Sequence, residues 1–233
     1  MSDSRHALFL IKTMNNLLKL LFFFALVMVG VTSCSKSDDN QDWRDEQRRL
    51  DSINNARIEA LLKEQAPVLK AFAEEHIPGA VLDDSTGIWF KVHAPGTAGS
   101  YTRWLVPGST GSLSLSRPTV EVKYTGKLLN GDTFDQTSTD DPEDKTRSFP
   151  LGSVIAAWDI AFYPKEIRLN GEDYKIGGLT EKGLQKGAII EFVAPSPYCY
   201  DRSTRKDKDG NITIPADSPL HFKIEVVDIK DTK

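Results

Sequence analysis

The chain has 233 residues, and 29 Lys and Arg stand against 33 Asp and Glu, giving a formal net charge of −4. This length indicates one domain with attached segments. The mildly acidic balance lacks the basic footprint of nucleic-acid-binding proteins. Two cysteines are too few for a disulfide scaffold or a four-thiolate zinc site, and the four histidines lack metal-ligand spacing. We therefore expect no metal and no cofactor.

The N-terminal segment carries an uncharged apolar run from Leu20 to Ser33. This run is too short to span a bilayer, which takes about 20 residues. A basic flank before it and small residues after it predict a secretory signal peptide over residues 1–33. The segment Val31-Thr32-Ser33-Cys34 resembles the bacterial lipobox, in which the cysteine is diacylated. The alternatives are a plain signal peptide with a chance cysteine at 34, or an internal start.

Acylation of Cys34 would make the protein an outer-membrane lipoprotein that faces the periplasm or the cell surface. Residues 34–41 would then be the acylated cysteine and a polar tether. Their acidic sequence resembles the export signal of surface lipoproteins in Bacteroidetes, although an ordinary solvated linker reads the same way.

Residues 42–78 predict a helical spacer, because they are rich in charged helix formers. The clearest apolar stripe runs from Leu62 to His76, with Pro67 placed in the first turn of that helix. Pro78 and the glycine after it end the pattern. The alternative to a spacer is a dimerisation arm that forms a homodimer through residues 42–77.

The period of hydrophobicity changes to two after residue 80, which predicts half-buried antiparallel strands. Alternating or apolar runs occur at residues 88–93, 120–125, 188–193 and 220–226. The pair Asn130-Gly131 predicts a tight hairpin turn between two strands.

Leu179 to Lys186 predict a short internal helix, with Thr180 near its start and Gly187 as its stop. Several strands and one short helix make the expected fold class α+β. Two stretches rich in turn residues, 97–116 and 160–177, look like inserted loops.

The residues show no nucleophilic triad and no phosphate-binding glycine motif, and the aromatic residues of the second half read by themselves as core. Five sequence blocks that contain most of these aromatic residues follow one another in a distinctive order: VEVKYTGKLLNGDTFD at 120–135, FPLGSVIAAWD at 149–159, GLTEKGLQKG at 178–187, YCYD at 198–201, and IP at 214–215 with LHFKIEVVDI at 220–229. In sequence and in order, these blocks closely resemble those of the FKBP-type peptidyl-prolyl isomerases.

The resemblance implies an FKBP-like domain over residues 79–233, in which an antiparallel sheet wraps around one short helix. It also implies an aromatic pocket for proline. Trp158 would form the floor; Tyr124, Phe134 and Phe222 the walls; Phe149 a further lining residue; Val154 and Ile155 the base; and Ile214 one side. Asp135 would lie beside the twisted amide, Tyr200 would donate its hydroxyl, and Ile155 would offer its N–H to substrate carbonyls.

The implied activity is cis–trans isomerisation of X–Pro bonds in proline-containing segments of exported or envelope proteins. The barrier of about 18–20 kcal/mol arises from amide resonance, so a dry pocket that favours the twisted, less polar amide accelerates rotation without proton transfer. This explains why no catalytic triad is needed.

Three positions depart from the family pattern. Arg147 stands where the family has phenylalanine, which predicts a polar or missing pocket wall; Ala157 and Asp201 replace glycines. The glycine that the family has at the position of Asp201 permits a backbone angle that other residues avoid. We therefore expect Tyr200 to be placed differently. These departures leave two alternatives open: a non-catalytic binding module on the same fold, and a structural lipoprotein with a vestigial pocket.

Overall fold

The computed structural model describes residues 38–108, 111–138, 140–141, 143 and 145–231. The predicted signal peptide and Cys34 lie outside these residues. Contacts divide the chain into two units, residues 1–54 and 55–233. Within the described residues, no helix has both the length and the apolarity needed to cross a membrane.

The described part of the first unit is the start of helix α2 (Asp38–His76). The side chains of residues 41–54 are exposed. Local ion pairs one turn apart join Arg48 to Asp45 at 3.1 Å and Arg49 to Glu46 at 2.8 Å. Such pairs stabilise an exposed helix by a few tenths of a kcal/mol each.

The second unit contains the rest of α2, and here the expectation for Pro67 was wrong. The proline lies inside one continuous helix and not in the first turn of a second one. An interior proline removes a helical hydrogen bond and costs about 3 kcal/mol. Burial of Leu69, Ala73 and Ile77, which pack with Val193 of the sheet, offsets that cost.

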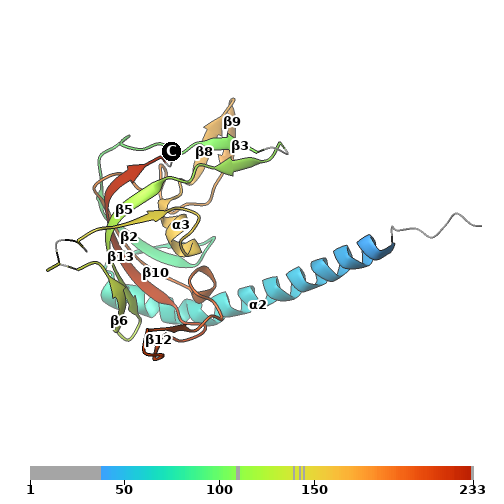
Figure 1. Ribbon diagram of the computed structural model, residues 1–233, viewed down its shortest axis with the longest axis horizontal. Coiled ribbons are helices and arrows are strands. Elements are labelled where there is room, and N and C mark those ends of the chain that lie inside the picture. Colours follow the sequence, from blue (N-terminus) through green and yellow to red (C-terminus); the bar gives the residue numbers. More distant parts are fainter. Residues whose placement is uncertain (1–37, 109–110, 139, 142, 144, 232–233) are drawn as a thin grey trace, which may run out of the picture. The chain divides into compact units, whose positions relative to one another are not determined.

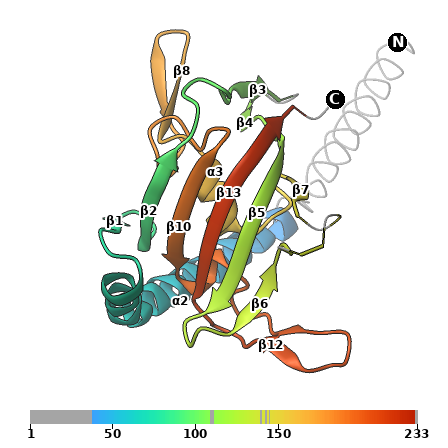
Figure 2. The ribbon, with the colours of Figure 1, turned by 90° about the vertical axis from the view of Figure 1, so that its left-hand side faces the viewer.

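A seven-stranded antiparallel sheet forms the centre of the second unit, in the order β1-β2-β10-β13-β5-β6, with β7 also paired to β5 (Figures 1 and 2). The strands are β1 (Val81–Asp83), β2 (Ile88–Pro95), β5 (Thr119–Leu128), β6 (Thr133–Gln136), β7 (Arg147–Pro150), β10 (Ala188–Ala194) and β13 (Leu220–Lys230).

The strands predicted from period-two alternation are confirmed, and so is the turn at Asn130-Gly131, which joins β5 to β6 with Gly131 at φ 95°. Alternation assigns the two faces of the sheet. In β10, Ile190 and Phe192 face one side and join the main core, whereas Val193 faces the other side and contacts α2.

Helix α3 (Ala156–Phe162) covers the core face of the sheet (Figure 2). The helix predicted at 179–186 was wrong: that segment is a series of turns. Gly183 has φ 74°, outside the helical range, and a Cβ there would lie 2.6 Å from the carbonyl oxygen of Phe162. The turns therefore pack backbone to backbone against the end of α3.

The segments expected as inserted loops form hairpins, and α3 extends into the second of them. The two-stranded pairs in the second unit are β3 (Leu105–Pro107) with β4 (Leu113–Leu115), β8 (Glu166–Leu169) with β9 (Glu172–Lys175), and β11 (Arg205–Lys206) with β12 (Ile212–Ile214). A 3₁₀ helix, η1 (Ser196–Tyr198), follows β10.

The sheet face opposite α3 carries a partly buried carboxylate between two histidines. Glu191 contacts His221 Nε2 at 3.0 Å and His93 Nε2 at 2.7 Å. The hydrogen bond with His221, followed by that with His93, lowers the pKa of Glu191 from its ordinary 4.5 to about 2, although burial opposes the shift.

A depressed carboxyl pKa contributes stability above the unfolded-state value and loses it as the pH falls through the folded-state value. We expect the wild-type free energy of unfolding to drop by about 2–3 kcal/mol more than that of Glu191→Gln between pH 5 and pH 2. Urea titrations at several pH values measure this, with Glu225→Gln, which removes an exposed partner of Lys123, as control. Parallel pH profiles for wild type and Glu191→Gln would contradict it.

Candidate functional site

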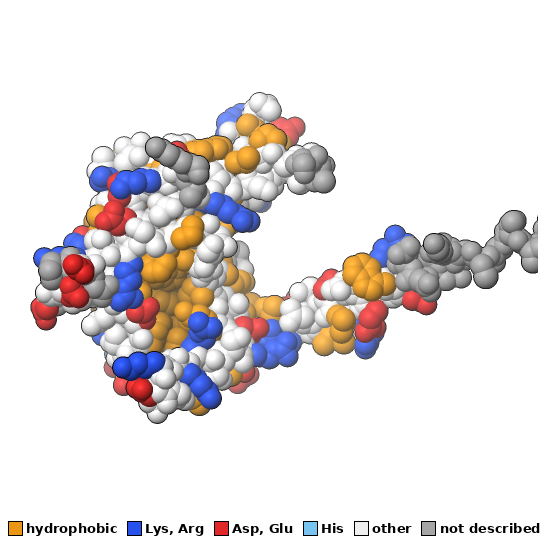
Figure 3. Space-filling view, in the orientation of Figure 1, with side chains coloured by type: hydrophobic (Ala, Val, Ile, Leu, Met, Phe, Trp, Pro, Cys, Tyr) orange, Lys and Arg blue, Asp and Glu red, His pale blue; other side chains and the backbone are white. Residues whose placement is uncertain are grey.

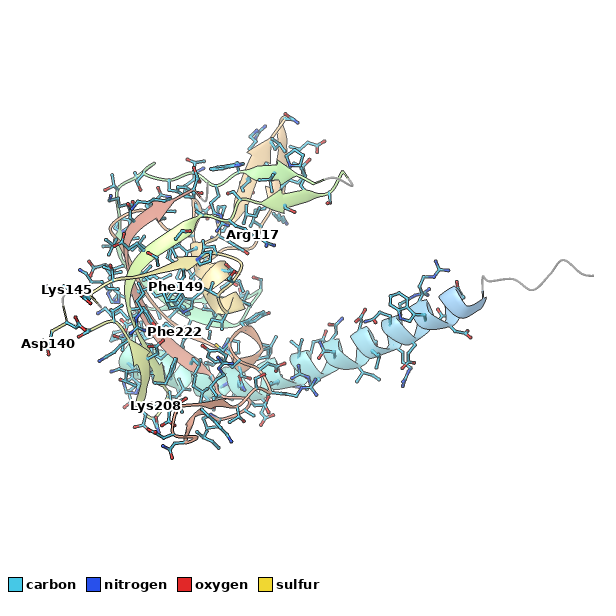
Figure 4. All side chains as sticks on the ribbon, viewed as in Figure 1. Arg117, Asp140, Lys145, Phe149, Lys208 and Phe222 are labelled. Atoms are coloured by element: carbon cyan, nitrogen blue, oxygen red, sulfur yellow. The ribbon has the colours of Figure 1, made fainter. Side chains whose placement is uncertain are left out.

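A cavity of about 350 Å³ opens on the same side of the sheet as α3. Hydrophobic side chains gather in this hollow, with basic side chains around it (Figure 3). Phe149 and Phe222 lie beside α3, and Lys208 marks the hairpin β11–β12 (Figure 4). The lining residues are Tyr124, Phe134, Asp135, Phe149, Ser153, Val154, Ile155, Trp158, Tyr200, Arg205 and Phe222.

The floor of the cavity is Trp158, which is 4% exposed and lies on α3. Three aromatic rings meet it edge to face: Tyr124 at 5.0 Å, Phe149 at 5.5 Å and Phe222 at 5.8 Å between centroids. Edge-to-face packing fixes ring orientations and adds about 0.5–1.5 kcal/mol per pair beyond area burial. Strands β5, β7 and β13 supply the three rings, so the sheet and the helix together shape a rigid apolar surface.

The polar rim of the cavity is built around Asp135 on β6. The hydroxyl of Tyr124 donates to Asp135 Oδ2 at 2.5 Å, and Arg147 Nη1 donates to Asp135 Oδ1 and to the Tyr124 hydroxyl, each at 2.8 Å. Burial and, after it, the hydrogen bond to Asp135 raise the pKa of Tyr124. The Tyr124 hydroxyl therefore stays protonated as a donor at any ordinary pH.

For Arg147 the sequence left open a polar or a missing pocket wall, and the structure excludes the polar wall. It does not line the cavity as a polar wall but pairs with Asp135, and its Nη2 also donates to the carbonyl of Gln136 at 3.0 Å. The side chain thus binds β7 to β6 at the rim. On the side of the cavity where the family has a phenylalanine in place of Arg147, the rings of Phe149 and Tyr124 still form the wall.

The base of the cavity is the turn that leads into α3. Ile155 is the N-cap residue, in an extended conformation, and its carbonyl accepts from Trp158 N–H at 3.0 Å. Asp159 Oδ1 accepts from Gly152 N–H at 2.8 Å and so fixes the turn to the helix. An N-cap N–H points away from the helical ladder, which suits the role expected for Ile155 toward a substrate carbonyl.

Tyr200 closes the far side of the cavity. Burial raises the pKa of its hydroxyl, and the guanidinium carbon of Arg205 lies 4.9 Å from its ring centroid. The next residue, Asp201, has φ 49°. An aspartate therefore adopts the left-handed conformation that the family's glycine would allow, and Tyr200 lines the cavity.

The structure brings nine of the ten pocket residues expected from the sequence to one cavity, and their chemical roles stay predictions. Ile214 is the exception: it is 3% exposed, belongs to the core cluster and does not line the cavity. Sequence reasoning missed Ser153 and Arg205. Arg205 lies in a charged segment that pairs with β12. No local sequence pattern indicates that this pairing brings it to the cavity.

Comparison with known proteins finds that a family model described as "FKBP-type peptidyl-prolyl cis-trans isomerase" matches residues 115–227. The FkpA of Buchnera aphidicola is 32% identical over 111 residues, which cover 48% of this chain and 33% of that protein. A probable FKBP-type isomerase of Haemophilus influenzae is 26% identical over 185 residues, covering 78% of this chain and 59% of that protein. The chain thus spans less than two thirds of the length of these relatives.

Among solved structures, the E. coli FkpA is 22% identical with a TM-score of 0.47, covering 100% of this chain and 97% of that one. A Pseudomonas syringae peptidyl-prolyl isomerase is 26% identical with a TM-score of 0.45, covering 75% and 96%. From the matched segment, which contains every residue that lines the cavity, we conclude that residues 115–227 are an FKBP-type peptidyl-prolyl cis-trans isomerase domain.

Proposed function

We propose that this protein catalyses cis–trans isomerisation of X–Pro peptide bonds in unfolded or extended polypeptide segments. The observation that carries the proposal is the cavity itself. An aromatic floor centred on Trp158 lies next to a rim in which Asp135 and Tyr124 are already oriented toward each other. Such a site holds a proline ring in an apolar environment and leaves polar groups beside the amide.

The reaction requires no further catalytic groups. Rotation about the X–Pro bond needs no proton transfer and no covalent step; its barrier of about 18–20 kcal/mol reflects lost amide resonance. An apolar environment favours the twisted amide because it is less polar than the planar one. Catalysis is then differential binding of the twisted form.

Each polar group at the cavity has a role in the proposed reaction. The proline ring stacks over Trp158, the N–H of Ile155 and the hydroxyl of Tyr200 donate to the substrate carbonyls, and Asp135 faces the twisting amide. Because burial raises the pKa of Tyr200, its hydroxyl remains a donor across the neutral range.

The proposal is tested by refolding a protein whose slow phase is limited by an X–Pro bond. Catalytic amounts of the full chain should shorten that phase. Trp158→Leu should abolish the effect, whereas Trp104→Leu, at an exposed tryptophan outside the cavity, should retain it. A slow phase unchanged by the wild-type chain would refute the activity.

A non-catalytic binding module is the second candidate, and one observation favours it. Both carboxylate oxygens of Asp135 are already engaged, one by Tyr124 and one by Arg147. If a substrate cannot compete with these partners, the cavity would hold a proline segment without accelerating its rotation. Binding of a proline peptide with no rate enhancement would select this candidate.

Arg205 predicts a substrate preference within the proposed activity. Arg205 lines the cavity, its guanidinium carbon lies 4.9 Å from the ring centroid of Tyr200, and among the described residues no acidic side chain forms an ion pair with it. An exposed charge pair contributes up to about 1 kcal/mol. We expect kcat/KM for a Glu-Pro peptide to exceed that for a Lys-Pro peptide by about threefold, and Arg205→Gln to bring the two together. Equal values for the wild type would contradict this.

The location of the protein belongs to the same proposal. Acylation at Cys34 would anchor the chain to the outer membrane and bring the cavity to exported proteins. The lipobox-like sequence Val31-Thr32-Ser33-Cys34 supports this. Mass spectrometry of the membrane fraction should find a diacylated N-terminal peptide that disappears in Cys34→Ser; a soluble, unacylated chain would refute it.

A homodimer through residues 42–77 also stays a proposal. Trp43, Leu50 and Ile53 are exposed on α2, at spacings of seven and three that place them on one helix face. Sedimentation of the full chain should give a dimer that Leu50→Lys dissociates. A monomer at micromolar concentration would exclude it.

A further inference from the structure

The loop that carries Tyr200 is tied to helix α2, which lies outside the family-matched segment 115–227. All the residues concerned belong to the second unit, 55–233. Two side chains of α2, Arg57 and Gln65, make the ties.

Both the nitrogen and the oxygen of the Gln65 side-chain amide form hydrogen bonds. Its Nε2 donates to Ser196 Oγ and to the carbonyl of Asp217, both at 2.9 Å, and its Oε1 accepts from Ser196 N–H at 2.9 Å. Gln65 is 7% exposed and Ser196 is fully buried. Buried hydrogen bonds of this kind are costly to leave unmade, so they fix Ser196 to the helix.

Arg57 binds Asp201 as a two-pronged ion pair. Nη1 donates to Oδ1 at 2.8 Å and Nη2 to Oδ2 at 2.7 Å. The hydrogen bond from Arg57 is the main cause that lowers the pKa of Asp201. A bidentate guanidinium–carboxylate pair fixes direction as well as distance.

The backbone of Asp201 links the two ties. Its N–H donates to the carbonyl of Ser196 at 2.9 Å, and its carbonyl accepts from Asp217 N–H at 2.7 Å. Ser196 and Asp217 are the two residues that Gln65 binds. Asp201 has φ 49°, in the left-handed region that residues other than glycine adopt infrequently. The surrounding hydrogen bonds stabilise this conformation.

We infer that Arg57 and Gln65 of α2 form a latch that positions Tyr200 at the cavity. Neither side chain lines the cavity, so both are positioning residues. The aspartate at 201, where the family pattern has glycine, supplies the carboxylate that makes the latch. The inference rests on the proposed isomerase function, because Tyr200 matters only if the cavity acts on a substrate.

Arg57→Gln in the full chain tests the latch. We expect kcat/KM for an X–Pro peptide to fall about tenfold, since small displacements of positioned groups cost up to a hundredfold. The matched control is Arg48→Gln, on the same helix, whose partner is the exposed Asp45; it should keep wild-type activity.

A merely structural ion pair is separated from a positioning one by repeating the change in Tyr200→Phe. In that background, Arg57→Gln should lower kcat/KM by less than a further twofold, because the hydroxyl it positions is gone. A full tenfold loss in both backgrounds would mean that Arg57 acts elsewhere and would overturn the inference.

If Arg57→Gln fails to fold, Asp201→Gly takes its place, because glycine keeps φ 49° without strain while losing the carboxylate. Amide hydrogen exchange provides a readout independent of turnover: relative to the intrinsic rate of each residue, either variant should speed exchange of the backbone N–H at position 201 about tenfold, and Arg48→Gln should not. Unchanged exchange in both variants overturns the latch. An inactive wild-type chain with faster exchange in the variants refutes the proposed function and leaves the latch standing.

Discussion

Asp135→Ala is expected to lower kcat/KM for an X–Pro peptide by about 30-fold, which corresponds to about 2 kcal/mol of transition-state stabilisation. The carboxylate orients the Tyr124 hydroxyl at 2.5 Å and neutralises Arg147 at 2.8 Å. Without it, the Arg147 guanidinium loses its ion pair with Asp135 at the rim of the cavity, and the Tyr124 hydroxyl loses its acceptor. Steady-state kinetics on a proline peptide measure the loss.

The matched control for this change is Asp173→Ala. Asp173 has the same side-chain exposure as Asp135, 47%, and also pairs with an arginine, Arg168, but it lies on the hairpin β8–β9 away from the cavity. Thermal unfolding of Asp135→Ala should remain cooperative. Wild-type kcat/KM in Asp135→Ala, or an equal loss in Asp173→Ala, would remove Asp135 from the mechanism.

Gly178→Ala is expected to lower the free energy of unfolding by about 4 kcal/mol or more, within the range reserved for severe steric defects. A Cβ at this position would lie 1.8 Å from the carbonyl oxygen of Tyr163 and 2.2 Å from its carbon. These are backbone atoms at the end of α3, so no side chain can move aside. The turn and the helix must separate, and the helix carries Trp158.

Gly171→Ala provides the comparison. Gly171 has φ 88° but no atom within 4 Å of the added Cβ, so only backbone strain of about 1 kcal/mol is expected there. Urea denaturation of both variants tests the pair. Similar losses of unfolding free energy in the two variants would show that the close contact with Tyr163 is not the reason why position 178 requires glycine.

The sheet was predictable from the sequence because its signal is local. From Val120 to Gly126 in β5 and from Leu220 to Val226 in β13, every second residue is buried, and the same alternation is visible in the sequence. Pairing of Ile224 with Tyr124 and of Phe222 with Gly126 then brings pocket residues together. The resemblance of the motif blocks supplied the rest of the pocket residues.

Helix α3 was missed for a physical reason. With seven residues and no side-chain cap on Ile155, it is too short to show a helical period. The stretch at 179–186 resembled a helix because Thr180 suits its start and Gly187 its end, yet Gly183 adopts φ 74°. Only packing against α3 decides which of the two segments is helical.

The ties that shape the site were out of reach of sequence reasoning because they are long-range. Arg57 and Asp201 are 144 positions apart, and nothing local distinguishes Arg57 from the exposed arginines of the same helix. Arg147 was noticed as a departure from the family, but its pairing with Asp135 follows from the register of β7 and β6 on β5.

The most direct test is two-dimensional exchange NMR on a short Leu-Pro peptide with a catalytic amount of the full chain. We expect cross-peaks between the cis and trans forms to grow far above the uncatalysed rate, which is tens to hundreds of seconds per event. Asp135→Ala should lose this enhancement, whereas Asp173→Ala should keep it. Peptide resonances that shift on titration while exchange stays at the uncatalysed rate would contradict catalysis and leave a binding domain.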